Sequence, residues 1–205
     1  TLTLHVQPVA LRDFVQRIAR AFKPLASQRA LTFKQHLSDA EGTVPADPEH
    51  LETVVVNLLS NAFKFTPPGG TITLRAEWQA QGVRLQVTDT GPGIPEDEHD
   101  TIFERFAQSS TAAASGGMAA NGTGIGLALV KALTEAHGGR VSVESTVGEG
   151  TTFTVHWPRT RDALPDDVET VRDAPSAETP MPHVQPEVAT PAAVHPSANG
   201  TTNEA

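Results

Sequence analysis

Two amide side chains and one ammonium group fall on the same side of an expected helix. At about 100° per residue, Asn57, Asn61 and Lys64 lie within about 60° of one another around the helix axis. A neighbouring stripe of the same helix is apolar and comprises Leu51, Val54, Val55, Leu58, Leu59 and Ala62. The apolar stripe is expected to pack, which leaves the polar side either as a solvated edge or as a surface for a ligand.

Boundary signals on both sides define this helix as residues 48–64. Asp47 can accept hydrogen bonds from the first free N–H groups, and Pro48 suits the first turn. The sequence TPPGG at 66–70 ends the helix. The three polar groups are therefore placed on one regular helix.

Residues 89–94 (DTGPGI) follow an expected strand and allow two interpretations. One is a plain turn. In the other, Asp89 ends the strand facing a pocket, while Gly91 and Gly93 let the flat ring of a ligand approach the backbone. A buried carboxylate at this place could accept a hydrogen bond from an exocyclic amine such as that of adenine.

Two further segments are marked by glycine. Residues 122–126 (GTGIG) open an expected helix, whose free N–H groups could bind phosphate. They do not form a P-loop, because no Lys-Ser/Thr follows, and a loop rather than a strand precedes them. Residues 148–151 (GEGT) indicate a hairpin turn, and the hydroxyl of Thr151 becomes relevant to a site if it lies beside Asp89.

The apolar periods predict which elements position these groups. Strands are expected at 2–7, 30–37, 71–79, 83–89, 140–145 and 151–157, and helices after Pro8, at 48–64, at 96–106 and at 124–137. Hairpin-connected strands and three amphipathic helices predict an α+β fold, a two-layer α/β sandwich with a mostly antiparallel sheet and the three main helices on one face. The Ala/Ser/Gly-rich residues 107–121 are expected to be a mobile loop that a ligand orders.

Composition divides the 205-residue chain into two parts. Residues 1–159 carry 13 basic and 16 acidic residues, which argues against a nucleic-acid surface. Residues 160–205 hold seven of the 16 prolines, have a net charge of −6 and show no apolar period, so a disordered tail or linker is expected. The absence of cysteine excludes disulfides and thiolate zinc sites. The sequence contains no apolar run of about 18 residues, so no membrane contact is expected.

Taken together, the motifs resemble those of one family. The Asn/Lys helix, DTGPGI, FERF at 103–106, GTGIGL and GEGT occur in this order and at these spacings. The combination resembles the ATP-binding catalytic domain of sensor histidine kinases, within the ATPase superfamily that includes gyrase, the Hsp90 chaperones and MutL. The resemblance covers about residues 1–159. It implies ATP and Mg²⁺ as cofactors and transfer of the γ-phosphoryl group to a histidine.

By position, the resemblance assigns residues to Mg²⁺-ATP. The family's Asn box corresponds to residues 57–66, in which Asn61 would bind Mg²⁺, Asn57 would support the metal and Lys64 would meet phosphate oxygens. These three are the candidate catalytic residues. Asp89 would recognise adenine. The other residues expected at the nucleotide are Phe65, Gly91, Gly93, Ile94, Phe103, Phe106, Gly122, Thr123, Gly124, Ile125, Gly126, Leu127 and Thr151.

These residue types suit that chemistry. Mg²⁺ prefers oxygen ligands and keeps several waters, so an amide oxygen and phosphate oxygens can hold it. Phosphoryl transfer chiefly needs charge neutralisation and alignment, which a metal, a lysine and helix N–H groups supply.

One position separates the competing functions. In the wider superfamily, enzymes that activate water usually carry Glu where this chain has Asn57, and an amide cannot take the proton. A neutral histidine is already a nucleophile, so a histidine kinase is favoured over an ATP-hydrolysing clamp of the gyrase or MutL type. A nucleotide-binding interaction module is the third alternative.

The resemblance also implies partners. They are the dimerisation and histidine-phosphotransfer hairpin of the parent kinase and, downstream, the receiver domain of a response regulator. None of the eight histidines lies in the expected acceptor motif H-(E/D)-x-(R/K)-T-P, so the acceptor is expected outside this chain. A cytoplasmic location is expected, which is compatible with a membrane anchor elsewhere in the parent.

Overall fold

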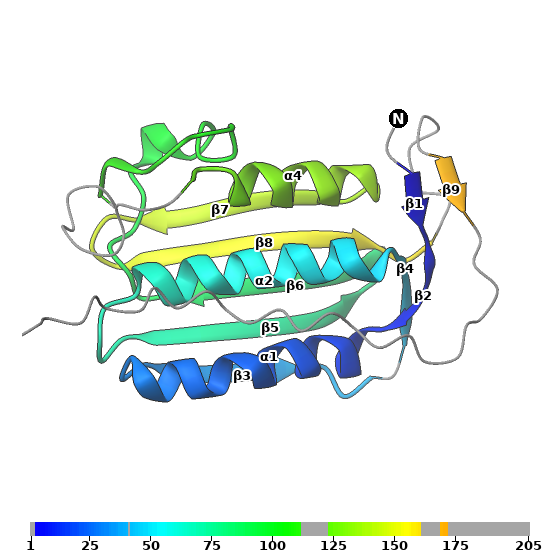
Figure 1. Cartoon of the computed structure of the whole chain (residues 1–205), viewed down its shortest axis with the longest axis horizontal. Coiled ribbons are helices and arrows are strands. Elements are labelled where there is room, and N and C mark those ends of the chain that lie inside the picture. Colours follow the sequence, from blue (N-terminus) through cyan, green and yellow to red (C-terminus); the bar gives the residue numbers. More distant parts are fainter. Residues whose placement is uncertain (1–2, 41, 112–122, 161–168, 172–205) are drawn as a thin grey trace, which may run out of the picture.

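The computed structural model describes residues 3–40, 42–111, 123–160 and 169–171. At its centre is a five-stranded sheet in the order β3-β5-β6-β8-β7 (Figure 1). The strands are β3 (Thr32–Leu37), β5 (Thr71–Gln79), β6 (Gly82–Asp89), β7 (Arg140–Thr146) and β8 (Gly150–Pro158). β3 and β5 pair in parallel, and the other three pairs are antiparallel. The prediction of a mostly antiparallel sheet is confirmed.

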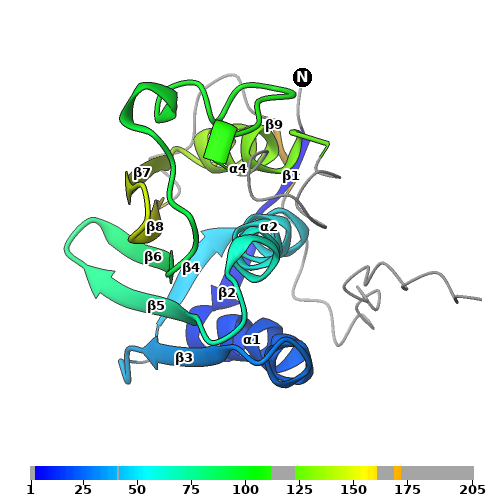
Figure 2. The same cartoon turned by 90° about the vertical axis from the view of Figure 1, so that its left-hand side faces the viewer.

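Three helices cover one face of this sheet, as the side view in Figure 2 shows. They are α1 (Leu11–Gln28), α2 (Pro48–Phe65) and α4 (Gly126–Ala136). Alternate strand residues point toward the helices, so that Val83, Leu85 and Val87 of β6 are buried. Burial of each such side chain contributes about 1.5–3 kcal/mol, which holds the two layers together. The α/β sandwich with three main helices on one face is therefore confirmed.

The boundaries and the buried side of α2 follow the prediction. All six residues of the expected apolar stripe are buried, and Phe63 joins them. The Asp47 Oδ1 atom accepts hydrogen bonds from the backbone N–H groups of Glu49 (3.1 Å) and His50 (3.4 Å), as an N-cap residue does. Because the stripe faces the sheet, the Asn and Lys side of α2 is turned toward α4 and the loops.

The N-terminal segment differs from the prediction of one strand at 2–7. It forms two strands, β1 (Thr3–His5) and β2 (Gln7–Ala10), and α1 begins only at Leu11. β2 pairs antiparallel with β4 (Thr43–Ala46), which the sequence did not suggest. Each strand contains a proline, and Pro8 and Pro45 are partners in the register. Because proline in a sequence argues against a strand, this short pair was not predicted.

The predicted helix at 96–106 is wrong beyond its first turn. Only Glu96–Glu98 form a helical turn, of the 3₁₀ type. At the other end, the Phe106 N–H donates to Gly124 O at 2.8 Å, and Phe106 has a φ of 69°. This tertiary hydrogen bond, to a segment 18 residues away, replaces the local bond that a helix would need.

The expected tail at 160–205 contains at least one strand. β9 (Glu169–Val171) pairs in parallel with β1. An edge strand such as β1 offers free N–H and C=O groups, and a short segment with Thr and Val can pair with them. The rest of the expected tail, apart from Thr160, lies outside the described residues.

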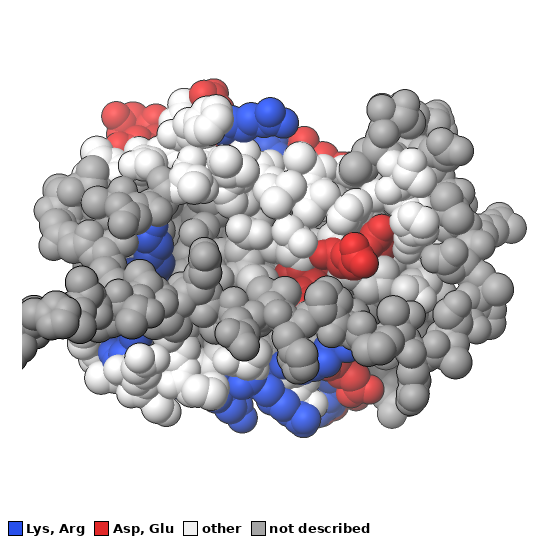
Figure 3. All heavy atoms as spheres, viewed as in Figure 1, with Lys and Arg blue, Asp and Glu red and all other residues white. Residues whose placement is uncertain are grey.

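The surface on the helix side carries mixed charge. In Figure 3, Lys/Arg and Asp/Glu form separate small groups over the described residues, with no continuous basic field on the visible part. Among the described helices, none combines the length and the apolar character needed to cross a membrane.

Candidate functional site

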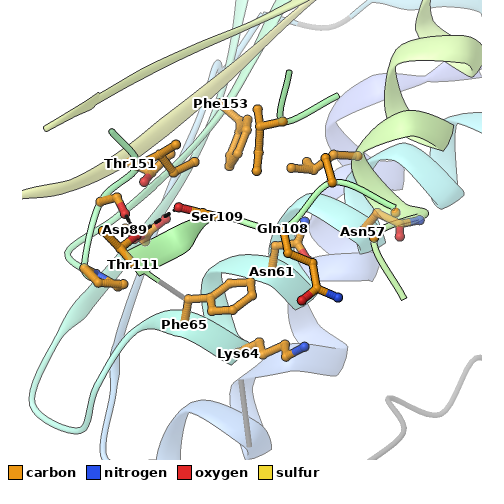
Figure 4. A pocket seen from close by; sticks show the side chains of 18 of the residues that line it. Asn57, Asn61, Lys64, Phe65, Asp89, Gln108, Ser109, Thr111, Thr151 and Phe153 are labelled. Atoms are coloured by element: carbon orange, nitrogen blue, oxygen red, sulfur yellow. Dashed lines mark hydrogen bonds between the residues drawn. The ribbon is translucent and has the colours of Figure 1, made fainter. Parts of the chain in front are cut away.

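A cavity of about 420 Å³ lies between the C-terminal half of α2, the site-facing ends of β6 and β8, and the start of α4 (Figure 4). It collects polar groups from four separate parts of the sequence. Those predicted from the sequence and found in its lining are Asn57, Asn61, Lys64, Phe65, Asp89, Gly93, Ile94, Thr123, Gly124, Gly126, Leu127 and Thr151. The fold therefore brings most of the predicted residues together.

Asn57 and Asn61 stand one turn apart on α2, but their side chains are held differently. The Nδ2 group of Asn57 donates to Thr53 O at 2.7 Å, which fixes the amide orientation. The Asn61 side chain makes no hydrogen bond to the described part of the chain, although it lines the cavity. The Asn61 amide oxygen is therefore available to a ligand, whereas Asn57 is already oriented by its own helix.

Lys64 places a cation at the edge of the cavity. Its Nζ lies 5.1 Å from the centroid of the Phe65 ring, a cation–π distance. Partial burial lowers the pKa of Lys64 from its ordinary value. No carboxylate in the described ranges forms an ion pair with Lys64, so its charge remains available for an anion.

Asp89 closes the sheet end of the cavity. It is the last residue of β6, only 7% exposed, and its Oδ1 accepts a hydrogen bond from the Gly91 N–H at 2.8 Å. Burial raises the pKa of Asp89 to about 6, against the opposing effect of the backbone N–H groups of Gly91 and Thr151. Thr151 pairs with Asp89 in the β6–β8 register. The two residues are therefore neighbours, which is the condition for Thr151 to belong to the site.

If Asp89 accepts a hydrogen bond from adenine, as the resemblance implies, its raised pKa means that adenosine binding weakens in mild acid. Protonation removes one acceptor from the carboxylate, so the adenosine affinity is expected to fall about tenfold between pH 7 and pH 5. Adenosine is the probe because it carries no phosphate that titrates in this range, and NMR titration measures its affinity. A flat profile for the wild-type chain would contradict the role of Asp89 as the acceptor.

The glycines near Asp89 are packed so closely against other protein atoms that a side chain would not fit. A Cβ on Gly91 would lie 2.7 Å from Asp89 Oδ1, and one on Gly93 (φ 73°) would lie 2.1 Å from Thr146 O. A Cβ on Gly150 would lie 2.0 Å from Asp89 O. The glycines were predicted to let a ligand approach, and the structure adds that they let the first glycine segment pack on the β7–β8 hairpin.

The second glycine segment adjoins α2. Gly124 has a φ of 65°, and a Cβ there would lie 2.5 Å from the Phe106 Cα. A Cβ on Gly126, the first residue of α4, would lie 2.7 Å from Asn57 Oδ1. The lack of side chains thus lets the N-terminus of α4 approach Asn57, and its free N–H groups attract anions.

Some predicted residues lie outside the cavity lining. The Gly91 N–H holds Asp89, and Phe103 packs against the core with its ring 6.1 Å from that of Phe153, which does line the cavity. Phe106 is 72% exposed and Ile125 is 44% exposed. Gly122 and residues 112–121 of the predicted loop lie outside the described residues.

The cavity also has lining residues that the sequence did not indicate, namely Pro92, Ile102, Ala107, Gln108, Ser109, Thr111 and Phe153. Phe153 lies two residues after Thr151 on β8, so the alternation of that strand could have revealed it. The Thr111 hydroxyl donates to Gly93 O at 2.5 Å and contacts the Ser109 hydroxyl at 2.9 Å. These hydroxyl contacts, drawn in Figure 4, tie the start of the 107–121 segment to the first glycine segment.

The polar groups that line the cavity fit a nucleotide with a bound magnesium ion. A buried acceptor lies at one end of the cavity, and two amide groups, an available ammonium and a helix N-terminus lie toward the other. The described residues contain no group of three His, Cys, Asp or Glu that could hold a metal. A metal held mainly by phosphate oxygens needs only one or two protein oxygens, which the asparagines can supply.

Comparison with known proteins identifies related sequences. Residues 46–161 match the model of the family described as "Histidine kinase-, DNA gyrase B-, and HSP90-like ATPase". Over 157 residues, the chain is 40% identical to the circadian input-output histidine kinase CikA of Synechococcus elongatus, covering 76% of this chain and 20% of CikA. It is also 40% identical over 136 residues to the adaptive-response sensory kinase SasA of the same species, covering 64% of this chain and 34% of SasA. The chain thus spans only a fifth to a third of these relatives.

Solved structures of histidine kinases are similar to this chain. The full-length ShkA structure in complex with AMPPNP superposes with a TM-score of 0.65 at 30% identity, over 78% of this chain and 33% of ShkA. A nucleotide-free catalytic domain of histidine kinase ThkA gives 0.67 at 26% identity, over 78% of this chain and 99% of that domain. The whole of a catalytic domain therefore corresponds to about three quarters of this chain.

Proposed function

The chain belongs to the family of histidine kinase-, DNA gyrase B- and HSP90-like ATPases, and we propose that it is the catalytic part of a protein-histidine kinase. It binds Mg²⁺-ATP and transfers the γ-phosphoryl group to a histidine on a separate helical hairpin, in two-component signalling. Residues 1–159 form the catalytic domain, and residues 160–205 form a tail or linker. The segment works in the cytoplasm.

One observation carries this proposal: a buried carboxylate, Asp89, and an available cation, Lys64, line the same cavity. Asp89 accepts a hydrogen bond from the adenine amine, and Phe65 lies beside the base. The triphosphate extends toward Lys64 and the N-terminus of α4. Asn61 would provide an oxygen ligand to Mg²⁺, and Asn57, one turn away on α2, would support the metal.

The single carboxylate described in the cavity lining favours phosphoryl transfer to a histidine rather than hydrolysis of ATP by water. Among the residues described as lining it, Asp89 is the one carboxylate, and it belongs to the adenine end. Asn57 lies against Gly126 at the N-terminus of α4, and its amide cannot act as a general base for water. A neutral imidazole nucleophile needs no such base.

An apolar strip beside the cavity gives the hairpin a place to bind. Phe106 and Ile125 flank Gly124, and Leu129 lies one turn after Ile125 on α4. All three are exposed to more than a third. Exposed apolar groups next to a site mark a contact surface for a partner, and an amphipathic helical hairpin has a matching apolar face.

The experiment separates binding from transfer. The chain alone is expected to bind ATP without acquiring an acid-labile phosphoryl label, because a histidine fixed on the domain cannot reach in-line geometry at the γ-phosphate. Adding the hairpin of the parent kinase is expected to produce acid-labile, base-stable label on the hairpin only. A hairpin whose acceptor histidine is replaced by glutamine is the control. Label on the 205-residue chain itself, or sustained ATP hydrolysis without the hairpin, would contradict the proposal.

A further inference from the structure

A buried histidine at the end of α4 makes two defined hydrogen bonds. His137 directly follows α4 and is fully buried. Its Nε2 lies 3.2 Å from the backbone N of Asp47, and its Nδ1 lies 2.7 Å from Leu133 O. Because the Asp47 N–H can only donate, Nε2 must accept, and the ring proton must sit on Nδ1 and donate to Leu133 O. Both ring nitrogens are satisfied only in this neutral tautomer.

The packing around His137 keeps the ring neutral and in place. Its centroid lies 4.4 Å from that of Trp157 on β8 and 5.7 Å from that of His50 on α2. Burial lowers the pKa of His137 from its ordinary value. The Asp47 carboxylate meanwhile caps α2 and accepts from His5 N at 2.9 Å. The contact of His137 with Asp47 therefore joins the C-terminus of α4 to the N-terminus of α2.

The same two helices meet again at the cavity, 11 residues earlier in α4. There Gly126 lies against Asn57, so closely that a Cβ would come within 2.7 Å of Oδ1. With about 1.5 Å of rise per residue, α4 is about 16 Å long. A rotation of about 5° around the His137 end would therefore move the cavity end by about 1.4 Å. A displacement of that size is enough to misplace groups that hold a phosphate.

Only one half of the cavity depends on this arrangement. Asp89 and Thr151 belong to the sheet, at the ends of β6 and β8 that face the site. Asn57, Asn61 and Lys64 stand on α2, and Gly126 and Leu127 on α4. A displacement of α4 relative to α2 and the sheet would disturb the phosphate half, whereas Asp89 and Thr151 on the sheet and Phe65 on α2 would stay in place.

We propose that His137 is a positioning residue for the phosphate half of the cavity: its hydrogen bond to the Asp47 N–H sets the placement of α4 against α2. This inference rests on the nucleotide binding proposed above. His137 touches no nucleotide itself. It acts through the N-terminus of α4 and its contact with Asn57.

The test compares adenosine with Mg²⁺-ATP, because their affinity ratio reports the phosphate half alone. In His137→Phe the ring remains but the acceptor is lost, and the ratio of ATP to adenosine affinity is expected to fall about tenfold. The adenosine affinity is expected to stay within about twofold of wild type, because Asp89 is untouched. In His137→Gln the ring is lost, but a side-chain oxygen can reach the Asp47 N–H, so the ratio is expected to be retained. His137→Asn, which is too short to reach Asp47, serves as a second loss variant if His137→Phe does not fold.

Several outcomes would overturn the inference. They are an unchanged ratio in the folded loss variant, equal weakening of adenosine and ATP, or a loss in His137→Gln as large as in His137→Phe. In the wild-type chain, ¹⁵N NMR is expected to show a protonated Nδ1 and an unprotonated Nε2, and the opposite tautomer would also overturn it. Failure of the proposed function is distinguishable, since the wild-type chain would then bind no ATP at all.

Discussion

Asp89→Asn is expected to lower the ATP affinity of the chain about 100-fold while making the fold more stable at neutral pH. The carboxylate offers acceptors to the adenine amine, whereas an amide can present a donor to that donor, and a hydrogen bond to a charged group is worth about 1.5–3 kcal/mol. Isothermal titration calorimetry measures the affinity, and thermal unfolding measures the stability.

The stability gain follows from the raised pKa of Asp89. In the unfolded chain this group has its ordinary pKa of 3.8, and in the folded chain a pKa of about 6. Between these values the folded state binds more protons, so the free energy of unfolding decreases as pH rises through this window. The full loss is about 3 kcal/mol above pH 6, and the amide avoids it. The stability advantage of Asp89→Asn is therefore expected near pH 7.5 and absent below pH 4.

A matched control is available on the same sheet. Glu144 is an exposed residue of β7 outside the cavity lining, so Glu144→Gln is expected to leave the ATP affinity unchanged. Asp89→Asn that binds ATP as tightly as wild type would remove Asp89 from the adenine site. A variant with no stability gain at pH 7.5 would show that the carboxylate is better solvated than its burial indicates.

The predictable part of the fold was the part with a strong local signal. The apolar stripe of α2, the Asp47 cap and the apolar alternation of the strands predicted these elements, and the turn signals predicted the hairpin pairs β5–β6 and β7–β8. The pairing of β6 with β8 was not predicted. That Asn57, Lys64 and Asp89 share one cavity was predicted by the resemblance of the combined motifs to the histidine kinase family.

The remaining differences come from tertiary contacts that leave no local pattern. The N–H of Phe106 donates to Gly124 O across 18 residues, so the last residue of the helix expected at 96–106 is bound to another segment instead. β9 pairs with β1 from a distant part of the chain, so composition alone gave no sign of it. The link between His137 and Asp47 joins residues 90 positions apart, and the sequence pattern indicates only that a helix ends near residue 137.

The largest loss of phosphoryl transfer is expected from Asn61→Ala. Its amide oxygen is unpartnered in the described part of the structure, and a bound divalent ion is among the strongest charges in such a site. The affinity for Mg²⁺-ATP is expected to fall at least about tenfold, and transfer to the hairpin about 1,000-fold, because the metal aligns and neutralises the γ-phosphate. Calorimetry with and without Mg²⁺ and transfer assays with the hairpin measure the two effects.

Metal-free ADP separates loss of the metal from loss of the fold. Its affinity is expected to stay within about twofold of wild type, because Asp89 and Lys64 remain, and alanine is a better helix former than asparagine. Ser60→Ala, on an exposed position of the same helix, is the matched control and should behave as wild type. Asn61→Asp keeps an oxygen ligand and is expected to retain Mg²⁺-dependent binding. If Asn61→Ala binds Mg²⁺-ATP as wild type does, the metal is held elsewhere and Asn61 is only part of the solvated edge of α2.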